Sequence, residues 1–399
     1  MKNSAGKKKR FTLSSKAKKL LTYFFAVAVV ILLVITAAQK LGNVTITTFT
    51  ADVKTYFMSL GAGDGYPYEV ELGTVKNIIA ANSNLNVLTN DKTLVLTSSA
   101  KELQPENHSY SEPAMKSKGS RLIVYDLSSG QFRVQSSAGT AKEFELEQPI
   151  TAAAISQKGC FAVTTYNENA QTVLYSYSKS GEQELTHNFG LERIIDMDIS
   201  SNGKYLAAAA VSASNGEMNS KLYIINLNSD GKEYVAELDY PGTTLLRVNY
   251  VKGNNIVALG DNIRSYIKNN SERTDDRSFN SDKLNDYSVA SNGSSTLLLS
   301  KYGSTSLSEL TFYTNKNKEK FTQTFDREVK SISTDGNHTA VLFDGEVRTY
   351  NKKGKQVGTI YFNGDPQRVV VDGGTTYVLT SVSIKSFKTK GTTDERQAD

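Results

Sequence analysis

The stretch MDISSNGKYLAAAA, residues 197–210, joins two apolar segments through a short polar turn that contains glycine. The same pattern returns as AAISQKGCFAVTT at 153–165 and as SISTDGNHTAVLF at 331–343. A segment rich in aromatic and apolar residues follows each copy, such as LYIINL at 222–227 and VLYSYS at 173–178. Repeats that each supply several short strands are typical of β-propellers and related arrays.

Aligned turns give the number of repeats. The turns occupy residues 80–84, 115–119, 156–159, 200–203, 251–253, 291–293, 334–336 and 372–374. Their ends are about 35 to 50 residues apart, which is the range of a four-stranded propeller blade. The sequence therefore predicts an all-β, eight-bladed β-propeller over residues 66–388, with seven blades as the alternative.

Strand patterns support this interpretation. The fourth repeat is expected to form strands over Arg193–Ser200, Lys204–Val211, Lys221–Asn228 and Glu233–Tyr240. The second strand of each repeat is nearly continuous in apolar residues, which indicates burial on both faces between neighbouring blades.

The two ends of the repeat region complement each other. The last repeat has no fourth strand after Lys388, whereas Tyr66–Leu72 reads as a strand without a blade. We therefore expect Tyr66–Leu72 to be the outer strand of the last blade, because this closure removes exposed sheet edges. Residues 389–399 are polar and are expected to form a disordered tail.

The N-terminal region indicates a membrane anchor. Residues 1–19 carry eight basic residues and no acid, and residues 20–38 form an uncharged apolar run. A helix of that length spans roughly 28 Å, close to the hydrocarbon thickness of a bilayer. A cleaved signal peptide and a buried core helix are the alternatives, although the run is long for a signal core and has no polar face.

The flanking charges predict the orientation of this transmembrane helix. The positive-inside rule makes residues 1–19 a cytoplasmic tail and places 39–399 outside the cell, with 39–65 as a juxtamembrane stalk. Within this stalk, 51–60 could form a short helix. Cys160 is the only cysteine, which is compatible with a bacterial envelope. The chain after the tail has a net charge of about −3 and no basic run, so nucleic acid is not an expected partner.

No pattern of side chains predicts a metal, a cofactor or a catalytic residue. His108, His187 and His338 share no metal-binding motif. Residues 226–231 resemble part of a calcium loop, but its first ligand position holds asparagine, so a hairpin turn is the preferred interpretation. Cys160 begins an apolar strand and is expected to be an inert thiol.

Two carboxylate pairs and three longer loops are possible sites. Asp196 and Asp198, like Glu69 and Glu71, lie two residues apart on one face of a strand, and solvent-facing carboxylates are the preferred interpretation. The segments 98–118, 167–172 and 212–220 are longer than a minimal connection and are expected to be tolerated insertions. The sequence leaves the binding residues unknown.

The repeats resemble the WD-repeat class, because SSNGKYLAAAA followed by KLYIINLNSDG matches its turn and strands without the Trp-Asp dipeptide. With its anchor and the segments 108–113 and 119–126, the chain also looks like an uncharacterised family of membrane-anchored bacterial propellers. That resemblance implies the fold and no activity. The tryptophan motifs of quinone-dependent dehydrogenases, the boxes of sialidases and the lipidated cysteine of the outer-membrane assembly propeller are missing.

These observations favour a single-pass protein of the cell membrane that presents a propeller as a binding or scaffolding module, without catalysis. An envelope protein or glycan is the expected partner, and the oligomeric state stays open. An envelope enzyme acting on a glycan or peptide at the channel is one alternative. A ligand sensor that signals through the basic tail is another.

Overall fold

The computed structural model describes residues 54–55, 57–70, 74–137, 139, 142–214, 216–228, 234–271, 273–280, 282–301 and 307–397. The predicted tail, transmembrane helix and most of the stalk lie outside these residues. Within the described part, no helix has the length and apolarity needed to cross a membrane. Residues 51–399 form one compact unit, to which the following description refers.

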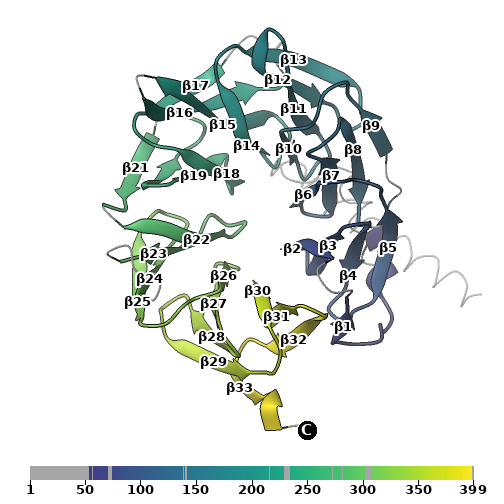
Figure 1. Ribbon diagram of the computed structural model, residues 1–399, viewed down its shortest axis with the longest axis vertical. Coiled ribbons are helices and arrows are strands. Elements are labelled where there is room, and N and C mark those ends of the chain that lie inside the picture. Colours follow the sequence, from purple (N-terminus) through teal and green to yellow (C-terminus); the bar gives the residue numbers. More distant parts are fainter. Residues whose placement is uncertain are drawn as a thin grey trace, which may run out of the picture. The chain divides into compact units, whose positions relative to one another are not determined.

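Eight sheets are arranged in a ring, and the first strand of each sheet is innermost (Figure 1). Blade 1 comprises β2 (Val75–Ala81), β3 (Asn84–Thr89), β4 (Lys92–Leu96) and β5 (Glu102–Asn107); blade 2 comprises β6 (Pro113–Lys118), β7 (Arg121–Asp126), β8 (Gln131–Ser136) and β9 (Lys142–Glu145). Blade 3 comprises β10 (Ala152–Ile155), β11 (Phe161–Asn167), β12 (Ala170–Tyr177) and β13 (Gln183–Phe189); blade 4 comprises β14 (Arg193–Ile199), β15 (Tyr205–Ser214), β16 (Glu217–Asn226) and β17 (Tyr234–Tyr240).

The second half of the ring repeats this plan. Blade 5 comprises β18 (Leu245–Val251), β19 (Asn255–Gly260), β20 (Ile263–Ile267) and β21 (Arg273–Ser278); blade 6 comprises β22 (Lys283–Val289), β23 (Ser295–Ser300), β24 (Ser308–Tyr313) and β25 (Glu319–Phe325). Blade 7 comprises β26 (Ser331–Thr334), β27 (His338–Phe343), β28 (Glu346–Asn351) and β29 (Gln356–Tyr361); blade 8 begins with β30 (Pro366–Asp372), β31 (Thr375–Thr380) and β32 (Ser383–Lys388). The prediction of an all-β, eight-bladed propeller is confirmed.

The ring closes through an N-terminal strand, as the orphan segment predicted. β1 (Tyr68–Glu69) pairs antiparallel with β32, with Tyr68 opposite Ile384. The Val70 N–H continues the pairing by donating to the Val382 carbonyl at 2.8 Å. The first described strand of the chain thus completes its last blade.

The C-terminal segment differs from the expected disordered tail. β33 (Gly391–Asp394) pairs in parallel with β29 as a fifth strand of blade 7, and the 3-10 helix η1 (Glu395–Gln397) follows. Gly358 permits this approach, because a Cβ there would lie 2.5 Å from the Thr389 carbonyl oxygen. The strand escapes a pattern-based prediction because its residues are polar and backbone pairing holds it.

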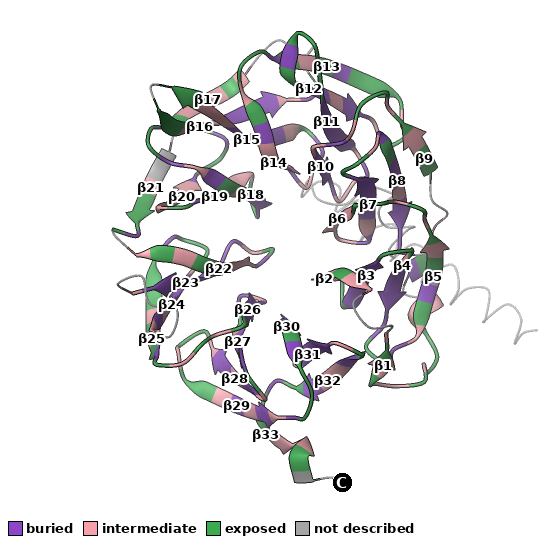
Figure 2. Cartoon of the chain, in the orientation of Figure 1, coloured by how far each residue is buried: buried purple, intermediate pink, exposed green. Residues whose placement is uncertain are grey.

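The core lies between neighbouring blades. Second strands are buried on both faces, as predicted: all six residues of β23 are buried, and in β15 five consecutive residues from Leu206 are buried. Fourth strands alternate between exposed and partly exposed residues, as in β17, and Figure 2 shows exposed stretches along the rim. The ring is therefore a continuous stack of packed sheets.

The three expected insertions are largely strands. Residues 98–118 contain β5 and β6, and 212–220 contain the paired ends of β15 and β16. Residues 167–172 form a tight hairpin between β11 and β12. Their polar composition gave no strand pattern in the sequence, because the ends of these strands project into solvent.

Candidate functional site

The central channel contains a cavity of about 520 Å³ lined by first strands and their following turns from all eight blades. Asp198 lines this cavity together with Lys116 and Lys118 of blade 2 and Arg247 of blade 5. Charged side chains from several blades therefore lie together at one end of the channel. Their contacts with one another decide how far they are available to a ligand.

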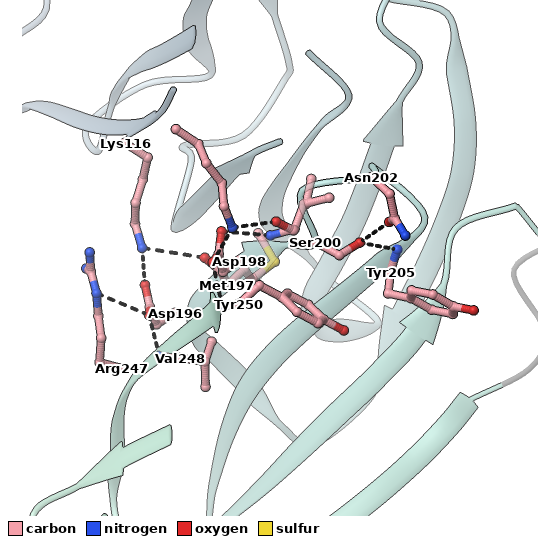
Figure 3. Close-up of polar contacts among 12 residues, drawn as sticks. Lys116, Asp196, Met197, Asp198, Ser200, Asn202, Tyr205, Arg247, Val248 and Tyr250 are labelled. Atoms are coloured by element: carbon pink, nitrogen blue, oxygen red, sulfur yellow. Dashed lines mark hydrogen bonds and ion pairs between the residues drawn. The ribbon is translucent and has the colours of Figure 1, made fainter. Parts of the chain in front are cut away.

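Asp196 and Asp198 form a network that ties three blades together (Figure 3). The Asp196 carboxylate is paired with Lys116 Nζ, accepts the Val248 N–H at 2.8 Å and lies 3.7 Å from Arg247 Nε. The charge of Asp196 raises the pKa of Arg247. Burial lowers the pKa of Lys116, even though Asp196 favours its charged form.

Asp198, two residues further along β14, has a similar set of contacts. Asp198 Oδ2 accepts Lys118 Nζ and the Tyr250 N–H, both at 2.7 Å. Asp196 is 4 % exposed, so the prediction of solvent-facing carboxylates is wrong for this pair. Glu69 is exposed on β1, and Glu71 lies outside the described residues.

Alanines in blade 3 make room for this network. Ala152 and Ala154 precede the turn residue Ser156 by four and two positions, as the two aspartates precede Ser200 in blade 4. The turns correspond, because the N–H groups of Ser156 and Ser200 both begin a turn with a 2.8 Å bond to a carbonyl of the next strand. With methyl groups at these positions, the lysines of blade 2 can reach past blade 3 to the carboxylates of blade 4.

The same positions join other blades. Asp286 Oδ2 accepts the Ile332 N–H at 2.9 Å, and Ser288 Oγ accepts the Thr334 N–H at 2.9 Å. Ser333 Oγ accepts the next equivalent N–H in blade 8 at 3.0 Å. These side chains satisfy inner-strand N–H groups that have no strand partner on that side, so most channel polarity is structural.

Asp335 and Asp372 at the channel end have a different environment. Both line the cavity, from neighbouring blades. Burial raises the pKa of Asp372, and the charge of Asp335 raises it further. The Asp335 carboxylate accepts the N–H groups of Asn337 and His338, each at 2.7 Å. The channel thus holds two carboxyl groups from neighbouring blades, one with a raised pKa and one that accepts two backbone N–H groups.

The histidines lie in separate parts of the ring. His108 Nδ1 accepts the Tyr110 N–H at 3.3 Å, and His187 Nε2 lies 2.5 Å from the Tyr234 hydroxyl. Burial lowers the pKa of both rings. His338 Nδ1 is 3.5 Å from an Asp335 oxygen. The described residues contain no group of three potential metal ligands.

Cys160 is partly buried, and Asn226 of the calcium-like segment takes part in a hydrogen bond within a turn. Burial raises the pKa of Cys160, whose sulfur would be 3.0 Å from a Cβ at position 203. Asn226 Oδ1 accepts the Asn228 N–H at 3.1 Å at the start of the β16–β17 connection. The other residues of the calcium-like pattern, Asp230 and Gly231, lie outside the described part.

One face of the ring is strongly acidic. We define the acidic face as the connections from second to third strands and from one blade to the next, which share one end of the strands. Its described connections contain three basic residues, Lys301, Arg327 and Lys330, and eleven acidic ones: Asp91, Glu112, Glu147, Glu168, Glu192, Asp261, Asp282, Asp326, Glu328, Asp344 and Asp365.

Apolar side chains are exposed on the same face. Leu191, in the connection between blades 3 and 4, is 86 % exposed. Four further exposed apolar side chains lie at the acidic-face ends of blades 2 to 5: Leu127, Tyr166, Met218 and Leu246. Exposed apolar groups within a charged surface are typical of a contact site.

The β11–β12 hairpin forms a ridge between two hollows. A cavity of about 640 Å³ includes Tyr166 and Glu168, and one of about 390 Å³ includes Tyr166 and Arg193. Asn167 Oδ1 accepts the N–H groups of Asn169 and Ala170 at 2.9 and 2.8 Å, which fixes the turn. A fixed aromatic ridge is suited to docking against another surface.

The sequence pattern predicts this hairpin only as a polar insertion, and it does not indicate Leu191. The available signal was a leucine in the Gly-Leu-Glu connection, where a single apolar residue has no burial pattern around it. Its exposure depends on the arrangement of blades 3 and 4, which no local pattern reveals.

Comparisons with solved structures confirm the fold. Sqt1 of Saccharomyces cerevisiae superposes with a TM-score of 0.57 at 10 % identity, covering 82 % of this chain and 100 % of that one. The C-terminal WD40 domain of Sif2 gives a TM-score of 0.57 at 12 % identity, covering 81 % and 99 %. BamB of Moraxella catarrhalis gives a TM-score of 0.50 at 10 % identity, covering 81 % and 100 %.

A comparison with curated proteins finds no match. The model of a family of unknown function, DUF5711, matches residues 67–393, which include all eight blades. The chain belongs to this family.

Proposed function

We propose that this protein is a membrane-anchored binding module of the cell envelope. In this proposal residues 20–38 span the membrane, the basic tail is cytoplasmic and the propeller is extracytoplasmic. The basic flank and the apolar run support the anchor. The propeller fold is typical of binding and scaffolding modules, and its rigid ring holds loops in fixed positions.

The observation that carries the binding function is the Tyr166 hairpin with the exposed Leu191 beside it. Both side chains are exposed on a face rich in carboxylates, and Tyr166 lines two hollows of several hundred cubic ångströms. Such a surface suits a protein partner that presents apolar side chains flanked by basic groups.

Photocrosslinking in cells would test the docking site. A crosslinking amino acid at Leu191 should yield a discrete adduct, and the same group at Val235, an exposed residue of the fourth strand, should not. The double variant Tyr166→Ser/Leu191→Ser should weaken capture of that partner by about tenfold or more, because central apolar residues dominate interface energies. Val235→Ser is the matched control. Equal capture by both variants would exclude this face as the docking site.

Proteolysis would test the topology separately. Protease added to intact cells should cut the chain near Gly61, between the predicted anchor and the first blade, and release the propeller. A cytoplasmic control protein should survive. Resistance of the intact chain, with cleavage of an outer-surface control, would contradict the extracytoplasmic location.

A second function is favoured by Asp335 and Asp372. Two carboxyl groups from neighbouring blades line one cavity, and the pKa of Asp372 is raised. Acid–base hydrolases use paired carboxyl groups, so a glycan or peptide at the channel end is a candidate substrate. Hydrolysis of envelope glycan or peptide that is lost in Asp372→Asn but retained in the Tyr166/Leu191 variant would support it. Wild-type protein without such hydrolysis would leave binding as the function.

A further inference from the structure

The face opposite the acidic face is covered with lysine. We define the lysine face as the connections from first to second and from third to fourth strands. Its described connections contain two carboxylates, Glu182 and Asp335, and eleven lysines: Lys101, Lys158, Lys179, Lys204, Lys252, Lys268, Lys316, Lys318, Lys352, Lys353 and Lys355. The near-neutral composition of the propeller therefore conceals two oppositely charged faces.

Most of these lysines are available for an external partner. Nine of the eleven are exposed and Lys158 is partly exposed, whereas Lys101 is partly exposed and its Nζ donates to two backbone carbonyls. In the described part of the chain, none of the eleven takes part in an ion pair, whereas on the acidic face Asp282 and Asp344 are paired with Lys301 and Lys330. Uncompensated like charge on a folded surface costs stability, and an anionic partner would relieve that repulsion.

The chain joins the propeller on this face. Lys101 Nζ donates to the carbonyls of Met58 and Leu60, each at 2.7 Å, at the end of the helical residues 57–59. The Gly63 N–H donates to Ser99 Oγ at 3.1 Å. These contacts place the N-terminal attachment beside the connection between β4 and β5.

We propose that the lysine face lies against the anionic headgroups of the membrane that holds the protein. This inference rests on the proposed anchor and adds an orientation to it. Residues 39–53 connect the apolar run to the first described residues and can reach at most about 50 Å. Tethering on the lysine face keeps these charges near the bilayer, where each contributes about 1 kcal/mol to attraction by anionic lipid.

The distribution of the lysines favours a bilayer over a nucleic acid. They occupy blades 1 and 3 to 7 around the ring, and the described connections of this face supply lysine without arginine. Lysine is a hydrated point charge on a flexible stem, whereas arginine and stacking aromatics dominate nucleic-acid sites. A broad lysine surface matches a broad anionic surface.

Charge on the opposite face supports the same orientation. An anionic bilayer repels the eleven carboxylates of the acidic face while it attracts the lysine face. The Tyr166 hairpin then points away from the membrane, where a partner can reach it.

The test uses residues 51–399, because all eight blades and the closing strand β1 lie in this compact unit. Vesicles of pure phosphatidylcholine and vesicles with 30 % phosphatidylglycerol are sedimented with the protein. The protein should bind the anionic vesicles only, and binding should fall steeply as salt rises. The triple variant Lys352/Lys353/Lys355→Gln should bind roughly 100-fold more weakly, at about 1 kcal/mol per lysine.

A charge-matched control removes three exposed basic residues at the acidic-face ends of their strands, Lys76, Arg193 and Lys283, again as glutamine. This control should stay within about twofold of the wild type, because its charges lie outside the lysine face. Thermal unfolding of each variant verifies that the ring is intact. Equal loss in both variants, or equal binding to both kinds of vesicle, would overturn the proposal.

Two further outcomes keep the alternatives apart. Tighter binding to a DNA duplex than to anionic vesicles at the same ionic strength would overturn the lipid assignment. Failure on vesicles, together with cleavage near Gly61 in intact cells, would refute this orientation and leave the anchored module standing. Binding to vesicles without that cleavage would refute the extracytoplasmic location and retain the lipid affinity.

Discussion

Replacing Asp196 should destabilise the ring far more than replacing its partner Lys116. In Asp196→Ala the fold loses two charge-assisted hydrogen bonds, from Lys116 Nζ and from the Val248 N–H. It also leaves a half-buried ammonium group beside an unpaired N–H. Removing one partner of a buried pair costs about 3 to 5 kcal/mol, and we expect about 4 kcal/mol here.

The reverse substitution should cost less. In Lys116→Met the carboxylate keeps the Val248 N–H at 2.8 Å and the Arg247 guanidinium at 3.7 Å. The buried charge therefore retains partners, and we expect a loss of about 1 to 2 kcal/mol. The double variant should cost less than the sum of the two single ones, because the sites are in direct contact.

Urea unfolding of residues 51–399, followed by tyrosine fluorescence because the chain has no tryptophan, measures these differences. Lys221→Met is the control, since its pair with Glu237 spans 3.5 Å between partly exposed side chains and should contribute at most about 1 kcal/mol. If Asp196→Ala lowered stability no more than Lys116→Met, the network would not hold the blades together.

Three other perturbations follow from the structure. Burial alone would raise the pKa of Asp126, but hydrogen bonds from neighbouring N–H and hydroxyl groups lower it to about 2. Asp126→Asn should therefore cost about 2 kcal/mol at pH 7, and in urea titrations this difference should shrink as pH falls from about 4 towards 2. Burial also raises the pKa of Cys160, so thiol reagents should modify it more slowly than free glutathione at pH 8 and accelerate at higher pH. Deleting residues 51–70 removes β1 and should cost about 3 kcal/mol or more, with faster hydrogen exchange in β32; unchanged exchange would show that β1 does not close the ring.

Much of the fold could be predicted because each blade repeats the same local chemistry. The Ser200–Gly203 turn and its counterparts need a positive φ, which Gly203 supplies at +74°, so glycines recur at blade spacing. Closure could be predicted from an unmatched strand at Tyr66–Leu72. The transmembrane helix stays a prediction, because residues 20–38 lie outside the described part.

The channel network could not be predicted from single strands. Asp196 and Asp198 occupy alternate positions of a strand, as solvent-facing residues do. Their partners, however, lie about 80 residues earlier and 50 residues later in the chain. Alignment of the turns would have placed these aspartates and the alanines of blade 3 at equivalent positions, seven and five residues before Gly203 and Gly159. Local periodicity describes one strand, whereas an inner-strand side chain is buried by two other blades.

For a related reason, the net charge of the propeller does not indicate its two oppositely charged faces. The propeller sums to near neutrality because strand reversal sends alternate connections to opposite ends of each blade, and evenly mixed residues along the chain become segregated in space. A lysine in the connection between β28 and β29 and an aspartate in the preceding one, between β27 and β28, are eight or more residues apart but lie on opposite faces. Assigning each charge to odd or even connections would have revealed both faces from the sequence once the strands were known. The orientation that we propose at the membrane thus follows from the parity of the connections, which a composition does not record.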